Sequence, residues 1–78
     1  MAPVATVVLP SLRSWRLRRG YSQERLAARI GMRRNVIWRI EAGHPTRLLT
    51  VRRLAAALGV QVADLSASRP SVPSTPAQ

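Results

Sequence analysis

The sequence predicts an all-α domain made of four or five short helices. The chain has 78 residues, which is enough for one small domain whose core holds a few helices but no large catalytic cavity. Apolar residues recur every three or four positions in successive segments, the spacing of one helix face. Four of these segments run into a glycine, the residue that most often ends a helix. Together these observations predict a compact helical bundle.

The first helix is expected to follow an apolar N-terminal segment. We expect residues 1–10 to form a flexible arm. Ser11 is positioned to cap a helix that runs to about Arg19, with Leu12 and Trp15 facing inward.

The segment from Gln23 to Ala42 predicts two short helices joined by a tight turn. Ser22 is positioned to cap the first of them, which leaves Gln23 at its N-terminus. Gly31 interrupts the apolar stripe and takes positive φ at little cost, so the chain can reverse there. The second helix is predicted to begin near Arg33. Two helices joined in this way are typical of a helix-turn-helix.

The C-terminal part of the chain predicts a loop over residues 44–49 and two more helices. Thr50 is positioned to cap the fourth helix, and a fifth short helix of about Val62–Leu65 closes the core. The helical domain is therefore predicted to cover residues 11–65. Residues 66–78 are rich in proline and serine with little to bury, and we expect a disordered tail.

The charge of the chain indicates a polyanionic partner. Thirteen cationic residues, all of them arginine, stand against three acidic ones, for a formal net charge of +10. Arginine binds phosphate and guanine with two parallel hydrogen bonds. A biased genomic composition would explain the choice of arginine over lysine, but it would not explain the excess of charge.

Several classes of protein are disfavoured by the composition. The chain has no cysteine, so disulfides and Cys-ligated metal are excluded. Its few acidic residues are scattered, and we expect no enzymatic activity, no cofactor and no metal. No apolar run approaches the ~20 residues that span a bilayer. Residues 2–9 are too short for a secretory signal and lack its basic leader, so we expect no membrane partner and a cytoplasmic protein.

The helix predicted over residues 33–42 has two chemically different sides. Placed at ~100° per residue, Ile37 and Ile40 share the side that faces the core. The residues on the opposite side are Arg34, Asn35, Trp38 and Arg39. Arginine pairs with guanine, and asparagine with adenine, in the major groove of DNA. The alternative is an ordinary solvated helix face.

Trp38 has three interpretations at this stage. An exposed indole usually has a partner. The first interpretation is contact with a thymine methyl group or a sugar edge of DNA. A second interpretation is packing in a dimer interface or on Arg34, one turn earlier. The third is partial burial against the preceding helix.

Five short motifs occur in order along residues 12–65. They are Leu12-x-x-Trp15-Arg16, Gly20-Tyr21-Ser22-Gln23-x-x-Leu26-Ala27, Ile30-Gly31, Ile37-x-x-Ile40-Glu41-x-Gly43 and Leu54-Ala55-x-Ala57-Leu58-Gly59-Val60. In this order and spacing they resemble the phage-repressor/Cro-type (XRE family) helix-turn-helix domain. The resemblance implies a phage-repressor-like bundle that binds DNA. Arg33 departs from the pattern, because the family usually has a capping Ser or Thr at this position.

The resemblance also implies roles for residues outside the predicted recognition face. Gln23 would contact the DNA backbone and brace the recognition helix, while Arg16 and Glu41 would form an ion pair between the first and third helices. The further backbone contacts are expected from Arg33, His44 and Arg47. The alternative for His44 is an ordinary solvated loop histidine. The alternative for Arg16 and Glu41 is two solvated ions whose interaction stabilises the fold by ~0–1 kcal/mol.

These observations together predict sequence-specific binding of double-stranded DNA. We expect a transcriptional repressor or regulator that acts as a homodimer on a pseudo-palindromic operator, with half-sites about one helical turn apart. The dimer interface is expected near Val62 and Leu65, or through residues 2–9 pairing as a strand. One alternative is a DNA-binding antitoxin, or a protein-interaction module with a toxin or other regulator as its partner. Another is binding of RNA or of any polyanion.

Overall fold

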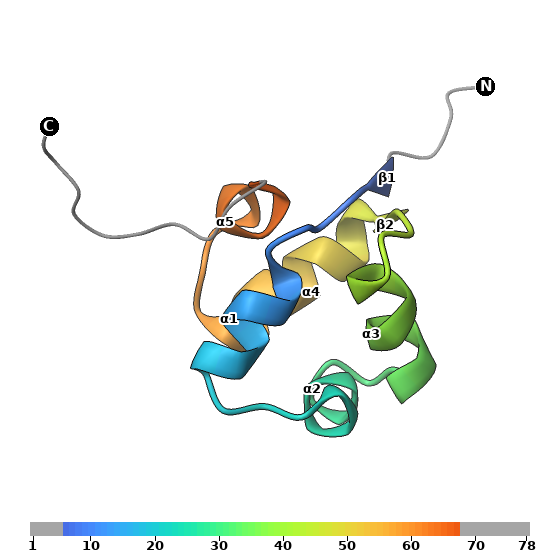
Figure 1. The fold of residues 1–78 in the computed structure, drawn as a ribbon, viewed down its shortest axis with the longest axis vertical. Coiled ribbons are helices and arrows are strands. Elements are labelled where there is room, and N and C mark those ends of the chain that lie inside the picture. The colour runs from blue at the N-terminus through green and yellow to red at the C-terminus, as the bar shows by residue number, and fades with distance from the viewer. Residues whose placement is uncertain (1–5, 68–78) are drawn as a thin grey trace, which may run out of the picture.

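Five short helices make up most of the computed structural model, which describes residues 6–67 (Figure 1). The expected all-α bundle is confirmed, and a small two-stranded sheet accompanies it. No helix in this part of the chain is long and apolar enough to cross a bilayer. The elements are, in chain order, β1 (Thr6–Val7), α1 (Leu12–Arg18), α2 (Gln23–Arg29), α3 (Arg34–Glu41), β2 (Thr46–Arg47), α4 (Leu48–Leu58) and α5 (Val62–Ser66).

The core receives apolar side chains from every helix. Helix α3 contributes Ile37 and Ile40, which are almost fully buried, so the orientation of α3 about its own axis is set by packing. The apolar residues of the core are Leu9, Leu12, Trp15, Leu26, Ala27, Ile30, Ile37, Ile40, Val51, Leu54, Ala55, Leu58 and Leu65.

The turn between α2 and α3 is formed as the sequence predicts. The Ser22 side chain accepts a hydrogen bond of 3.0 Å from the backbone N–H of Arg25 and so caps α2. Gly31 has φ +73°, a conformation that L side chains rarely adopt. Because the reversal takes so few residues, α3 lies directly beside α2 (Figure 1).

Two predicted caps are wrong, for different reasons. Ser11 precedes α1, but its hydroxyl donates to the carbonyl of Ala67 at 2.6 Å instead of capping the helix. Thr50 does not cap α4, because α4 begins at Leu48 and Thr50 is buried inside it. The helix starts earlier because Leu48 packs against the core and the preceding residue is held in a strand.

The expected flexible arm is part of the fold from residue 6 onward. Strand β1 pairs antiparallel with β2, with Thr6 opposite Arg47. Leu9 is only 1% exposed and belongs to the core. Burial of an apolar side chain of this size contributes roughly 1.5–3 kcal/mol, which opposes the entropy lost when the segment is ordered. Residues 1–5, the rest of the expected arm, lie outside the described residues.

The C-terminal boundary of the domain also differs slightly from the expected one. Helix α5 extends to Ser66, and Ala67 accepts the hydrogen bond from Ser11. Residues 68–78, most of the expected tail, lie outside the described residues. Leu65 is completely buried, whereas Val62 is partly exposed, so of the two residues named for the expected dimer interface only Val62 reaches the surface.

Helix α1 is tied to α4 by an arginine to which the sequence analysis assigned no contact. Arg19 donates from Nε to the carbonyl of Leu58 at 2.8 Å, at the C-terminal end of α4. The guanidinium groups of Arg18 and Arg19 lie 5.2 and 5.1 Å from the centroid of the Trp15 ring, within the range of a cation–π contact.

Candidate nucleic-acid interface

The outward side of α3 carries the four residues that the helical wheel predicts. Helix α3 is amphipathic, and its buried positions are Ile37 and Ile40. The exposed positions are Arg34, Asn35, Trp38 and Arg39. We refer to these four residues as the recognition face.

Three of the four recognition-face residues surround one shallow pocket. Arg34, Asn35 and Trp38 line a hollow of about 200 Å³. The Trp38 side chain is 53% exposed, so nearly half of it is covered by the protein itself. Arg39 lies one turn beyond Asn35 and does not line this hollow. The hollow therefore brings a guanidinium, a carboxamide and an indole together on the surface of one helix.

The C-terminal end of α3 is held by a buried ion pair with α1. Arg16 donates from Nε to Glu41 Oε2 at 2.5 Å and from a terminal nitrogen to Oε1 at 3.1 Å. Its other terminal nitrogen donates to the backbone carbonyl of Tyr21 at 2.9 Å. The Arg16 and Glu41 side chains are only 8% and 6% exposed. The pair thus links α1, the α1–α2 loop and α3 in a region shielded from water.

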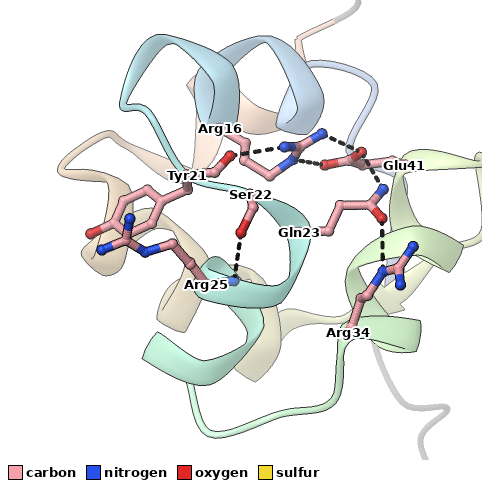
Figure 2. Close-up of polar contacts among 7 residues, drawn as sticks. All are labelled: Arg16, Tyr21, Ser22, Gln23, Arg25, Arg34 and Glu41. Atoms are coloured by element: carbon pink, nitrogen blue, oxygen red, sulfur yellow. Dashed lines mark hydrogen bonds and ion pairs between the residues drawn. The ribbon is translucent and has the colours of Figure 1, made fainter.

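Gln23 lies between this ion pair and Arg34 of the recognition face (Figure 2). Its Nε2 donates to Glu41 Oε1 at 3.0 Å, and its Oε1 accepts from Arg34 Nε at 3.5 Å. The first bond assigns the amide orientation, since only the NH₂ end can donate to a carboxylate. The carbonyl end is then directed at Arg34. A chain of four side chains, Arg16–Glu41–Gln23–Arg34, therefore runs from the buried pair to the exposed start of α3.

The other residues expected at the DNA backbone are exposed but belong to separate segments. Arg33 is the N-cap residue of α3 and makes no side-chain capping bond. His44 lies after α3, where its backbone N–H donates to the carbonyl of Arg39 at 3.1 Å. Arg47 belongs to β2 and is the N-cap residue of α4, so it is not in a free loop as predicted. All three side chains are exposed.

Arg13 borders the candidate interface, and the sequence analysis did not single it out. It lines a pocket of about 340 Å³ together with Arg16, Gln23, Trp38 and Glu41. Trp38 is the one residue common to the linings of this pocket and of the Arg34 hollow. The position of Arg13 could have been predicted from helical spacing, because Arg13 precedes Arg16 by three residues and so lies on the same side of α1.

Comparison with known proteins gives two matches. A family model described as helix-turn-helix matches residues 12–65. Among solved structures, the chain is similar to the hypothetical transcription factor NHTF from Neisseria, with a TM-score of 0.70 and 30% sequence identity. That similarity covers 86% of this chain and 85% of the Neisseria chain. A comparison with curated protein sequences finds no significant match.

Both matches agree with the resemblance drawn from the five sequence motifs, which is thereby confirmed. The family model spans α1 to α5, and so includes the α2–Gly31–α3 unit and the buried pair between Arg16 and Glu41. The chain belongs to the XRE-type helix-turn-helix family.

Proposed function

We propose that this protein is a transcriptional regulator that binds double-stranded DNA sequence-specifically with α3 in the major groove. The observation that carries the proposal is the shared hollow of Arg34, Asn35 and Trp38 on the exposed side of α3. An α-helix fits the major groove, where each base pair presents a distinct set of donors and acceptors. The solved neighbour is itself named as a hypothetical transcription factor, which supports the same function.

Within the recognition face we assign base contacts to Arg34, Asn35 and Arg39. Arginine donates to O6 and N7 of guanine, and asparagine pairs with N6 and N7 of adenine. For Trp38 we propose contact with a thymine methyl group or a deoxyribose edge, because this half-exposed residue lines the same hollow as Arg34 and Asn35. The surface hydrogen bond from Arg34 Nε to Gln23 Oε1, at 3.5 Å, favours one orientation of the Arg34 side chain before DNA binds, and preorganisation of this kind lowers the entropy cost of binding.

The DNA backbone is proposed to be held by residues outside this face. Arg33, His44 and Arg47 are exposed near the two ends of α3 or at the start of α4. Gln23 is half-buried, and its amide retains one N–H beyond the bond to Glu41. Contacts of this kind set the register of the protein on the duplex but carry no sequence information directly.

We further propose that the regulator acts as a homodimer on a pseudo-palindrome and represses by covering a promoter. A single domain of this size buries little DNA-contacting surface, and two copies on half-sites one turn apart raise both affinity and specificity. An antitoxin would need an apolar segment that is free to wrap its toxin. Leu9 is in the core and Val7 packs against it, so this alternative is not favoured.

The test is selection of binding sites from random duplexes, followed by affinity measurements on the selected and a scrambled site over a salt series. Arg34→Ala and Asn35→Ala should each cost about 1–3 kcal/mol on the selected site and relax preference at one base pair. Arg47→Ala should weaken both duplexes about equally and reduce the salt slope by about one unit. Arg52→Ala is the matched control, an exposed arginine on α4 outside the proposed interface.

Equal losses on both duplexes for Arg34→Ala and Asn35→Ala would contradict the assignment of α3 as the recognition helix. Selection that returns no enriched motif would contradict sequence-specific binding and favour general polyanion binding. An enriched motif without two-fold symmetry, bound by one protein per duplex, would contradict the dimer.

A further inference from the structure

A groove lies between the C-terminal end of α2 and the outer side of α4, and none of the proposed DNA-contacting residues lines it. Its volume is about 450 Å³, and it is wide open to solvent. The lining residues are Arg29, Ile30, Arg53, Ala56 and Ala57.

The floor of the groove is aliphatic. Ala56 and Ala57 are consecutive residues of α4, and their methyl groups leave space that larger side chains would occupy. Ile30 closes α2 and is 7% exposed. A floor of this composition favours an aliphatic side chain of a ligand and offers no aromatic ring on which a nucleic-acid base could stack.

The rim of the groove is cationic and uncompensated. Arg29 and Arg53 are exposed, and within residues 6–67 neither makes a side-chain hydrogen bond or an ion pair. The chain has only three acidic residues. Glu41 is bound to Arg16, and Asp64 is bound to the backbone N–H of Gln61. The third, Glu24, lies in the first turn of α2, at the other end of the helix from Arg29, and lines a different pocket. The charge on this rim therefore calls for carboxylates from another molecule.

We propose that this groove docks an acidic amphipathic segment of another protein. An aliphatic side chain of the segment would rest on Ile30 and the two alanines, and flanking carboxylates would pair with Arg29 and Arg53. A second copy of this chain is a poor occupant of this groove, because two of its three acidic residues, Glu41 and Asp64, already have partners. Binding here leaves the recognition face free, so the same domain can hold DNA and a protein partner together.

The probe is a short synthetic helical peptide with leucines on one side flanked by glutamates, added to the full isotope-labelled chain and followed by NMR. We expect saturable shifts of the backbone amides of Ile30, Ala56 and Ala57, and little change in α3. A peptide with glutamine in place of every glutamate should bind at least about tenfold more weakly, because it offers the arginines no charge. No saturable binding of the acidic peptide would overturn the proposal.

Matched arginine variants distinguish specific pairing with the two rim arginines from attraction by the net charge of the protein. Arg29→Gln and Arg53→Gln should each weaken peptide binding about three- to tenfold. Arg25→Gln and Arg52→Gln change the net charge equally on the same two helices but do not line the groove, and they should have less than a twofold effect. Equal losses in all four variants would show attraction by net charge alone and would overturn the proposal.

Ala56→Leu tests the floor without changing charge. Ala56 is exposed on α4, and leucine is a good helix former, so the variant should fold and bind the selected DNA site as before. It should lose peptide binding by at least about tenfold, because the larger side chain occupies the part of the floor on which the peptide leucine would rest. Unchanged peptide affinity in Ala56→Leu would overturn the proposal. So would a single-stranded oligonucleotide that competes with the peptide for the groove, since the site would then take nucleic acid.

Discussion

Removing the guanidinium of Arg16 should destabilise the domain far more than removing that of an exposed arginine, because the buried carboxylate of Glu41 loses its ionic partner. In Arg16→Met the aliphatic stem still packs, but Glu41 keeps only its bond from Gln23, and the carbonyl of Tyr21 loses its side-chain partner. The Glu41 side chain is 6% exposed, so water compensates poorly. Breaking a buried pair in this way costs about 3–5 kcal/mol.

Thermal and urea unfolding followed by circular dichroism measure this loss. In a domain of this size each kcal/mol lowers Tm by about 4–8 °C, so Arg16→Met should lower Tm by at least about 12 °C. Arg52→Met is the matched control, because Arg52 is exposed on α4 and should change stability by no more than about 0.5 kcal/mol.

The double variant Arg16→Met/Glu41→Leu decides between a buried pair and two independent ions. Replacing both partners removes the uncompensated charge, so the double variant should be more stable than Arg16→Met alone. We expect a coupling energy of about 3 kcal/mol from the full cycle. If Arg16→Met is too unstable to measure, recovery of cooperative unfolding in the double variant answers the question. A coupling energy below about 0.5 kcal/mol would refute the reasoning.

Three further predictions test the ends of the structural elements. Arg33 is an N-cap residue with extended φ and ψ, but its side chain makes no capping hydrogen bond. Arg33→Ser should therefore raise the free energy of unfolding in urea by about 1 kcal/mol, and an unchanged or lower value would contradict this prediction. Leu9→Ala should cost about 2–5 kcal/mol, and the half-exposed neighbour Val8→Ala less than about 1 kcal/mol; equal small effects would show that the segment is not docked. Removing Ser66–Ala67 in addition to 68–78 should lower stability by about 1 kcal/mol relative to removing 68–78 alone, because the hydrogen bond from the Ser11 hydroxyl to the Ala67 carbonyl is lost. Two truncations of equal stability would contradict that bond.

Much of this fold is predictable because its signals lie close together in the sequence. Ser22 caps α2 within its own first turn, and Gly31 takes the positive φ that ends it. The spacing of Ile37 and Ile40 sets which side of α3 faces the core. The same helical periodicity predicts which residues of α3 form the exposed recognition face. Family motifs add the Arg16–Glu41 pair, which joins residues 25 positions apart.

The errors all concern contacts between distant segments. Thr50 has the chemistry of a cap, but pairing of β2 with β1 and packing of Leu48 move the start of α4. Leu9 lies next to a proline in an apolar run, and the neighbouring residues do not indicate whether its side chain is buried in the core or belongs to a free arm. Ser11 precedes a helix as a cap should, yet its hydroxyl bonds to Ala67 across the domain.

The sequence by itself determined the family, the helices of the central unit and the chemical character of α3. These follow from residue type and spacing within one or two helical turns, where backbone geometry leaves few alternatives. Only the tertiary structure decided that Gln23 joins the buried pair to Arg34, that Arg13 borders Trp38, and that Arg29 and Arg53 flank one groove. Those arrangements depend on how helices pack against one another, because packing of the whole core sets the distances between side chains on different helices.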